Sequence, residues 1–263
     1  MKNFLVLTGF LSVSPYVMAV NQFDVSYQHN NFEQVADSNT LKLSTKISQN
    51  NFFESIYSDV EFKKWDIKDS PLDDSGVSGH LVGYYNFGKD ERLFGVTQLQ
   101  LGSSNLFPKS TLYQEISYRA GEKKNILLGA GFGYQNYYDD DSDTFYKIGP
   151  VYYFDSGAVG YKFGKYNESG SKLNSLFGNY KINDKWDIDA VYNFGEGYWD
   201  YQNSIAVASA NVKSSDFDIK LSYHINPNVI IHGNFGETKI KDKDTNKTSL
   251  SSDNAGIGVM YNW

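Results

Sequence analysis

One segment near the end of the chain, FDIKLSYHI, contains the three side chains of a hydrolase: Asp218, Ser222 and His224. A serine nucleophile and its histidine base must lie within hydrogen-bond reach of each other. On a strand, residues two positions apart have Cα atoms about 6.6 Å apart, so Ser222 and His224 would meet only through bent side chains. A lipid-cleaving enzyme must also turn its nucleophile towards lipid, whereas Ser222 alternates with the apolar Leu221 and Tyr223. The sequence therefore predicts no catalytic residue and a protein that is not an enzyme.

A second candidate is the acidic segment YYDDDSD. Clustered carboxylates are the ligands that hard divalent cations prefer. The segment is no EF-hand, because that loop requires Gly at its sixth position and Glu at its twelfth, and this one has Thr144 and Pro150. We interpret it as a solvated acidic loop tip, with contact to cation-bridged lipopolysaccharide as the alternative, and we predict no bound metal or cofactor. The four carboxylates are Asp139, Asp140, Asp141 and Asp143.

A third candidate is the aromatic segment EGYWDYQ, which contains Tyr198, Trp199 and Tyr201. Flat aromatic side chains on an external loop could stack on sugar rings. Tyr and Trp are also the residues that gather where a membrane meets water. The sequence leaves a glycan-contacting loop and an interfacial aromatic belt as equal interpretations.

The elements that carry these residues alternate apolar and polar positions along most of the chain. In WDIDAVYNF the apolar side chains from Trp186 to Phe194 share one face, and in ILLGAGFGY those from Ile126 to Tyr134 alternate with glycines. A period of two residues is typical of β-strands. The 21 Tyr and 18 Phe also favour strands. The sequence predicts an all-β protein.

The breaks between these strands are alternately short and long. Short breaks include GKDE at 88–91 and NPN at 226–228, and longer polar breaks include those around 30–38, 66–76, 102–109 and 241–247. Short turns at one end and long loops at the other are typical of outer-membrane barrels. Because such barrels usually have an even number of strands, we interpret SIAVASANV (204–212) as an extension of the strand that ends near Ile225. We predict an up-and-down antiparallel transmembrane β-barrel of about 14 strands, with 12 or 16 as the alternatives.

Alternation alone does not say which face points inwards, and a soluble sandwich or lipocalin-like barrel is the competing interpretation. A closed barrel of about 14 strands is too wide for one layer of apolar side chains to fill. Aromatic residues also lie near the ends of the apolar faces, as interfacial girdles require. We therefore expect the apolar face to contact lipid. The predicted girdle residues are Tyr84, Tyr118, Tyr134, Trp186, Phe194 and Trp263.

The polar face would then line the lumen. Its charged residues have both signs and form no obvious selectivity ring. A conducting lumen and a polar plug that only stabilises the barrel remain equal interpretations. The lumen candidates are Glu115, Arg119, Lys147, Asp187, Asp189, Asp218, Lys220 and His224.

The first 19 residues differ from the rest of the chain. They combine Lys2, an apolar stretch from Phe4 to Val13, and Val17 and Ala19 before an expected cleavage site, which is the layout of a secretory signal peptide. We expect a signal peptide at 1–19 and the barrel at 20–263. The chain has no cysteine, and its net charge of −7 without a long basic run argues against nucleic acid as a partner.

The closing segment NAGIGVMYNW resembles the last strand of Gram-negative outer-membrane proteins, whose terminal aromatic residue serves the barrel-assembly machinery. The family norm there is phenylalanine, and this chain ends on Trp263 after Tyr261. The second half, including YYDDDSD, the Gly-Pro that follows it and GEGYWDYQ, is similar to the YaiO family of outer-membrane barrels over roughly residues 110–263. The resemblance implies a location in the outer membrane, contact with lipid and lipopolysaccharide, and a role with surface polysaccharide.

Two functions follow from these observations as expectations. In the first, the lumen passes or helps to export a hydrophilic solute, and the resemblance suggests a polysaccharide. In the second, the barrel does not conduct, and its external loops bind surface glycan or lipopolysaccharide.

Overall fold

The computed structural model describes residues 21–32, 36–48, 53–67, 74–87, 92–104, 106–138, 141–197 and 212–263. Within that part of the chain every regular element is a strand, and no helix is long and apolar enough to cross a membrane. The strands are β1 (Gln22–Phe32), β2 (Ala36–Ser48), β3 (Phe53–Ile67), β4 (Asp74–Asn86), β5 (Leu93–Gly102), β6 (Ser110–Ala120), β7 (Ile126–Asn136), β8 (Ser142–Phe154), β9 (Gly157–Tyr166), β10 (Lys172–Lys181), β11 (Trp186–Glu196), β12 (Val212–His224), β13 (Val229–Asp242) and β14 (Thr248–Asn262).

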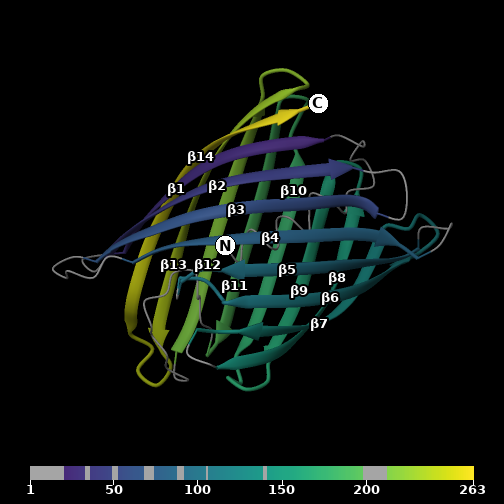
Figure 1. The fold of residues 1–263 in the computed structure, drawn as a ribbon. Coiled ribbons are helices and arrows are strands. Elements are labelled where there is room, and N and C mark those ends of the chain that lie inside the picture. Colours follow the sequence, from purple (N-terminus) through teal and green to yellow (C-terminus); the bar gives the residue numbers. More distant parts are fainter. Residues whose placement is uncertain are drawn as a thin grey trace.

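The strands form one closed antiparallel barrel in which each strand pairs with its neighbours in sequence (Figure 1). Closure comes from β1 and β14, which pair along the whole of β1 from Gln22 opposite Asn262 to Phe32 opposite Ser252. The prediction of 14 strands is confirmed. Most of the segment 204–212 lies outside the described residues, and β12 begins at Val212.

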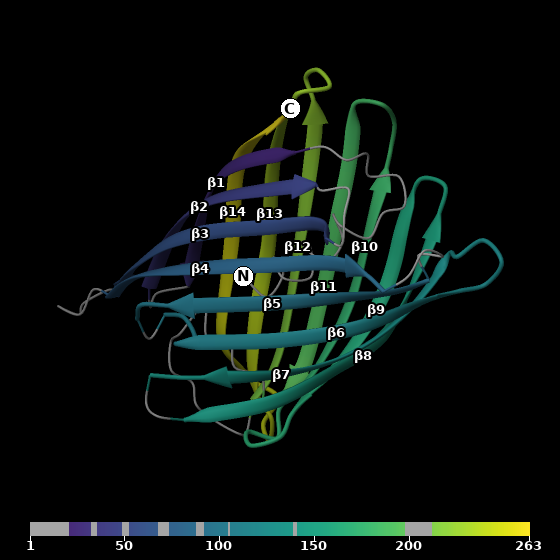
Figure 2. The same ribbon diagram turned by 45° about the vertical axis from the view of Figure 1, so that its right-hand side comes forward.

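The predicted alternation of short and long connections holds only in part (Figure 2). At the end where β1 begins and β14 ends, the connections span two to six residues, at 49–52, 87–92, 121–125, 155–156, 182–185 and 225–228, and those at the other end span three to fifteen and overlap them in length. The opposite end has the loops, of which 197–211 is the longest. The loop expected around 30–38 is shorter than predicted, because β1 continues to Phe32 and β2 begins at Ala36. In outer-membrane barrels the turns are periplasmic and the loops are extracellular.

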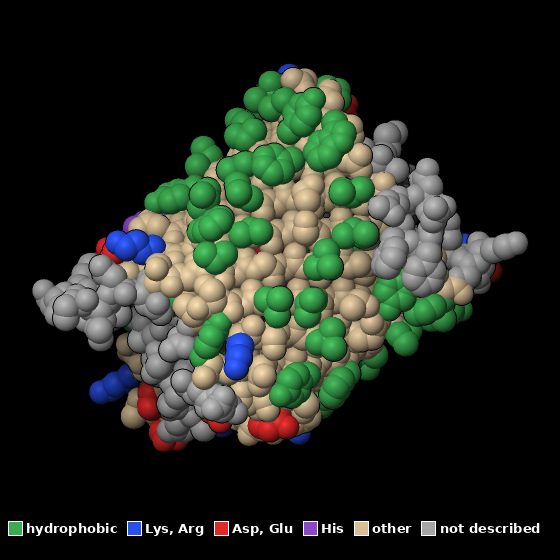
Figure 3. All heavy atoms as spheres, in the orientation of Figure 1, with side chains coloured by type: hydrophobic (Ala, Val, Ile, Leu, Met, Phe, Trp, Pro, Cys, Tyr) green, Lys and Arg blue, Asp and Glu red, His purple; other side chains and the backbone are tan. Residues whose placement is uncertain are grey.

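The two faces of the barrel have opposite character. Outward side chains are apolar and exposed, with Ile257 at 66% and Phe235 at 54%, whereas inward Asp59 and Glu61 are only 4% and 2% exposed. Figure 3 shows hydrophobic side chains spread across the outer surface, with charged ones mainly near its ends. A lipid environment requires this arrangement, because strands can span it only in a closed barrel with an apolar exterior. The prediction of an inside-out membrane barrel is confirmed, and the soluble alternative is wrong.

One predicted girdle residue lies on the other face. Tyr84 is only 2% exposed and packs inside the barrel with Tyr57, Val82 and Val96. The sequence GYYN has two consecutive tyrosines, and neighbouring residues on a strand point to opposite sides. The parity set by buried Val82 therefore turns Tyr84 inwards and leaves Tyr85 on the outer face.

The closing strand ends at the turn end of the barrel. Ile257, Val259 and Tyr261 point outwards, and the ring of Trp263 stacks on that of Tyr261 with centroids 6.4 Å apart. The amide of Trp263 donates to the carbonyl of Asn21, so backbone pairing with the start of β1 continues to the last residue. The role of Tyr261 and Trp263 as an assembly signal stays a prediction. The expected signal peptide lies outside the described residues.

Candidate functional site

The inner wall of the barrel is the candidate site, since it gathers charged side chains from nearly all strands. All eight lumen candidates predicted from the sequence occupy inward positions of their strands. The inward charges of the first half were not predicted, although the alternation in LKLSTKIS and SDVEFKKW marks them. The inward charged residues and histidines that were not predicted include Asp24, Lys42, Lys46, Asp59, Glu61, Lys63 and His80, together with Lys162, Asp216 and His232 of the second half.

The first group of inward charges lies on β2, β3 and β4. Asp59 Oδ1 is 3.2 Å from Lys42 Nζ and 2.8 Å from His80 Nδ1, and all three residues are buried. The strand register explains these contacts. Asp59 lies directly opposite His80 on β4, and Lys42 of β2 lies opposite Glu61, two residues from Asp59 on the same face of β3. A buried charge needs such partners to offset its lost hydration. This group holds the wall of three neighbouring strands together.

The second group is centred on Glu115 of β6. Its Oε2 accepts hydrogen bonds from Tyr113 Oη and Lys162 Nζ, both at 2.6 Å, and its Oε1 accepts one from Ser117 Oγ at 3.0 Å. Lys162 comes from β9, so the carboxylate reaches across the inner surface of β7 and β8. Each carboxylate oxygen therefore has a partner, and Glu115 fixes three side chains on the lumen wall.

An aromatic stack lies next to this group, over the inward glycines of β7. The rings of Tyr113, Phe145 and Tyr166 stack in sequence, with centroids 5.7 Å and 5.0 Å apart. A Cβ at Gly131 or Gly133 would lie 2.3 Å from the Tyr113 or Phe145 side chain, so glycine leaves the space in which the rings lie. This packing explains the glycines of ILLGAGFGY.

Lys147 of β8 lies on this stack. Its Nζ is 5.4 Å from the ring centroid of Tyr113 and 5.2 Å from that of Phe145, within the range of a cation–π interaction. The ammonium group of Lys147 therefore lies over the aromatic stack, so a cation and aromatic rings lie side by side on the lumen wall.

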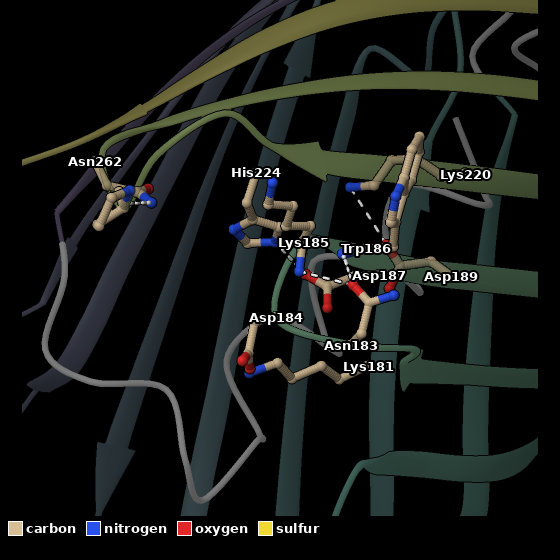
Figure 4. Close-up of polar contacts among 11 residues, drawn as sticks. Lys181, Asn183, Asp184, Lys185, Trp186, Asp187, Asp189, Lys220, His224 and Asn262 are labelled. Carbon is tan, nitrogen blue, oxygen red and sulfur yellow. Dashed lines mark hydrogen bonds and ion pairs between the residues drawn. The ribbon is translucent and has the colours of Figure 1, made fainter.

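The third group, on β11, β12 and β13, is mainly acidic. Asp187 pairs with His224, and Asp189 Oδ2 is 3.5 Å from Lys220 Nζ (Figure 4). Asp216 and Asp218 instead accept hydrogen bonds from neutral amides, at 2.9 Å from Asn193 and 3.3 Å from Asn234. In the turn between β10 and β11, the hydrogen bond and the charge of Lys181 lower the pKa of Asp184.

The inward charges are therefore sorted by position. Apart from the first and last residue of each strand, six cations and four carboxylates point inwards on the arc β2–β9, and four carboxylates with one lysine do so on β11–β13. The prediction of a mixture of signs rested on residues of the second half alone. The cations of the arc β2–β9 are Lys42, Lys46, Lys63, Arg119, Lys147 and Lys162, and its carboxylates are Asp59, Glu61, Glu115 and Asp143.

Two residues of the hydrolase pattern, Asp218 and His224, pair with side chains outside it. His224 pairs with Asp187, and Asp218 accepts from Asn234. Ser222 lies opposite His232 in the strand register, and His232 Nε2 is 2.9 Å from Asp24 Oδ1. The strand geometry thus separates these side chains into different contacts, and the expectation that none is catalytic stays a prediction.

The acidic segment is described only in part. Asp139 and Asp140 lie outside the described residues, as do Tyr198, Trp199 and Tyr201 of the aromatic segment. Asp143 is buried and accepts hydrogen bonds from the Glu168 and Ser169 amides and from Ser169 Oγ, at 3.0, 3.2 and 2.7 Å. Asp143 therefore anchors the β9–β10 loop, while Asp141 is exposed. Within the described ranges no three His, Asp or Glu side chains are grouped to hold a metal.

The loop between β5 and β6 turns into the extracellular mouth. Leu106 and Phe107 are 3% and 0% exposed and pack against Phe32 and Trp65, whose stacked rings are 4.7 Å apart. The sequence predicted a polar external loop at 102–109. The loop is instead held inside the mouth by the burial of Leu106 and Phe107, although the residues around them are polar. One side of the mouth therefore carries an apolar cluster.

The comparisons with known proteins agree on the fold. No family model matches the chain, and no curated protein matches it. The outer membrane protein Omp33 of Acinetobacter baumannii is 12% identical, with 93% of this chain and 99% of that one covered at a TM-score of 0.52. The translocator domain of the autotransporter NalP from Neisseria meningitidis is 9% identical, with 100% and 95% covered at 0.54. OccD1 (OprD) is 9% identical, with 93% and 95% covered at 0.51.

At these identities the likeness establishes the fold alone. The chain is a closed 14-stranded barrel of the Gram-negative outer-membrane type, with its outer face in contact with lipid. The resemblance to the YaiO family stays a prediction.

Proposed function

We propose that this protein is a channel that lets a hydrophilic solute cross the outer membrane. The observation that carries the proposal is the inner wall, where charged residues of both signs line a closed 14-stranded barrel. Barrels of such width can hold an aqueous lumen. The excess of cations over carboxylates on β2–β9, and of carboxylates over cations on β11–β13, would orient a polar solute as it passes. No step of this function needs a catalytic residue or a cofactor.

We further propose a carbohydrate as the solute. The support is the sequence resemblance to YaiO together with the hydroxyl, amide and charged groups of the wall, which match the hydrogen-bonding groups of sugars. A polysaccharide partner, and the assembly machinery as a partner of the closing strand, remain expectations of the sequence.

A second candidate is a barrel that does not conduct and serves as a structural or adhesive scaffold. It is favoured by the close pairing of inward charges, as in Lys42–Asp59–His80 and Glu115–Lys162, and by the apolar cluster at the mouth. Paired charges that fill the lumen would stabilise the barrel without a water path.

Planar-bilayer recording of the refolded protein separates the two candidates. A channel gives stable conductance steps, and the steps respond to the charge of the permeating ion. A silent bilayer from protein that shows the heat-dependent gel mobility of a folded barrel would contradict the channel and support the scaffold.

The apolar cluster at the mouth gives a second test of the channel. In the double variant Leu106→Ser, Phe107→Ser, the loop loses its apolar contacts with Phe32 and Trp65, and burying a large apolar side chain stabilises by about 1.5–3 kcal/mol. We expect the loop to leave the mouth and the single-channel conductance to rise. Lys109→Ser, at an exposed position of the same loop, should leave conductance unchanged. Equal conductance in the double variant and the wild type would show that this loop does not narrow the path.

A further inference from the structure

A row of lysines crosses the outer face of the barrel at its extracellular end, over five consecutive strands. In the strand register Lys165 of β9 lies opposite Lys172 of β10, and Lys172 lies opposite Glu196 of β11. Glu196 in turn lies opposite Lys213 of β12, which lies opposite Lys241 of β13. The lysine row consists of Lys165, Lys172, Lys213 and Lys241, with Lys239 and Lys243 beside it.

Carboxylates balance only part of this charge. Lys243 Nζ is 3.0 Å from Glu196, and Lys239 Nζ is 2.6 Å from Glu237. The ammonium groups of the other four lysines have no ion pair or hydrogen bond to another residue that the structure describes. The row is thus strongly positive in a chain whose net charge is −7.

Glu196 lies between Lys172 and Lys213 in the row and offsets part of their charge, but lysines of the row also face one another directly. Lys165 and Lys172 are directly opposite each other on neighbouring strands, and so are Lys213 and Lys241. Like charges in directly opposite positions destabilise a sheet. Two such pairs in one row therefore indicate a surface that is neutralised by a partner.

The position of the row selects the kind of partner. The side chains lie on the lipid-facing side, because each lysine has the same parity as the exposed apolar residues of its strand. On β9 and β11, Phe163 and Phe194 precede the row by two residues and mark the end of the apolar band. Lysines just beyond an apolar band can extend along it and hold their ammonium groups at the headgroup level. Phosphate groups of lipids lie at that level.

Among the residues that the structure describes, the positive surface does not extend to β14 or to β3. At the extracellular end of β3 the outward Lys64 is paired with Asp66 at 2.7 Å. On β14, Asp253 lies opposite Glu237, so the positive surface ends at β13. The charge is therefore concentrated on one sector, as expected for a discrete docking surface.

We propose that the lysine row binds the phosphorylated headgroup of an outer-leaflet glycolipid, whose acyl chains lie on the apolar band of β9–β13. This site is separate from the lumen and does not depend on whether the barrel conducts. The lysines act as point charges on phosphate oxygens, so the binding is electrostatic and weakens with salt.

The test uses the full barrel refolded in detergent, with diphosphoryl lipid A and dephosphorylated lipid A in mixed micelles as the two probes. The quadruple variant Lys165→Gln, Lys172→Gln, Lys213→Gln, Lys241→Gln removes the unpaired lysines. A cationic side chain near a charged lipid surface contributes about 1 kcal/mol. We expect the variant to bind diphosphoryl lipid A at least about tenfold more weakly than the wild type, and to bind the dephosphorylated lipid equally well.

A matched control removes the same charge at the periplasmic end through Lys123→Gln, Lys124→Gln, Lys181→Gln and Lys185→Gln, and should bind like the wild type. Heat-dependent gel mobility confirms that every variant is folded. Three results would overturn the proposal: an unchanged affinity in the quadruple variant, an equal loss in the control, or a wild type that does not distinguish the two lipids. Tighter binding of soluble alginate than of lipid A at the row would also overturn the assignment to a lipid.

Discussion

A Gly258→Leu substitution is expected to destabilise the barrel by about 3 kcal/mol or more, because it breaks a buried contact across the closing seam. His232 of β13 and Asp24 of β1 are 208 residues apart in sequence, and their side chains meet at 2.9 Å over β14. Gly258 of β14 lies between them, and a Cβ there would be 2.3 Å from His232 Cε1 and 2.9 Å from Ser26 Cβ. A leucine forces His232 aside and leaves the buried carboxylate of Asp24 without this partner.

The measurement is urea unfolding of the refolded barrel, followed by tryptophan fluorescence and by heat-dependent gel mobility. Gly233→Leu is the matched control, since it introduces the same side chain on the adjacent strand at an exposed position, where a Cβ would be 3.6 Å from its nearest atom. Equal stability of the two variants would show that the contact between Asp24 and His232 does not hold the seam.

Phe235→Arg is expected to destabilise the barrel by about 2–4 kcal/mol, the cost of an arginine on the lipid face near the bilayer midplane. Phe235 lies in the middle of β13 and is 54% exposed on the outer face. In lipid a guanidinium there loses its hydration and gains no partner, whereas in a soluble protein an exposed arginine would cost almost nothing.

The neighbouring residue supplies the control. Asn234 points into the lumen and donates to Asp218 at 3.3 Å, so Asn234→Arg places the same charge beside a carboxylate. We expect this control to unfold at a urea concentration close to that of the wild type in lipid vesicles. If Asn234→Arg were the more damaging of the two, the assignment of the two faces would be reversed.

The sequence predicted the architecture well because a barrel wall is specified locally. Each strand records its own two faces, as in WDIDAVYNF, and an even strand number follows from a barrel whose chain starts and ends at the same side. The interpretation of 204–212 as an extension of the strand that ends near Ile225 stays a prediction, because only Val212 of this segment is described. Where two aromatic residues are adjacent, this local signal fails. Tyr84 and Tyr85 fit either parity, and packing against Val82 and Val96 decided that Tyr84 lies inside.

The candidate site could be predicted only as a set of inward residues. Glu115 and Lys147 are recognisable from parity, but the register decides that Glu115 meets Lys162, which lies 47 residues later. The inward charges of β2 and β3 carry the same period-two signal and were missed. The β5–β6 loop could not be predicted, since its sequence is polar apart from Leu106 and Phe107 and only the surrounding strands provide the surface on which those two side chains are buried.

By itself, the sequence determined the fold class, the membrane-facing side and the place of the closing strand, because these depend on the spacing of residues within single strands. The tertiary structure alone decided which side chains meet. Closure brings Asp24 to His232 over Gly258, and the register aligns lysines from separate strands in one row. The physical reason is that contacts across a barrel depend on strand order and stagger, and neither is recorded in the local pattern of residues.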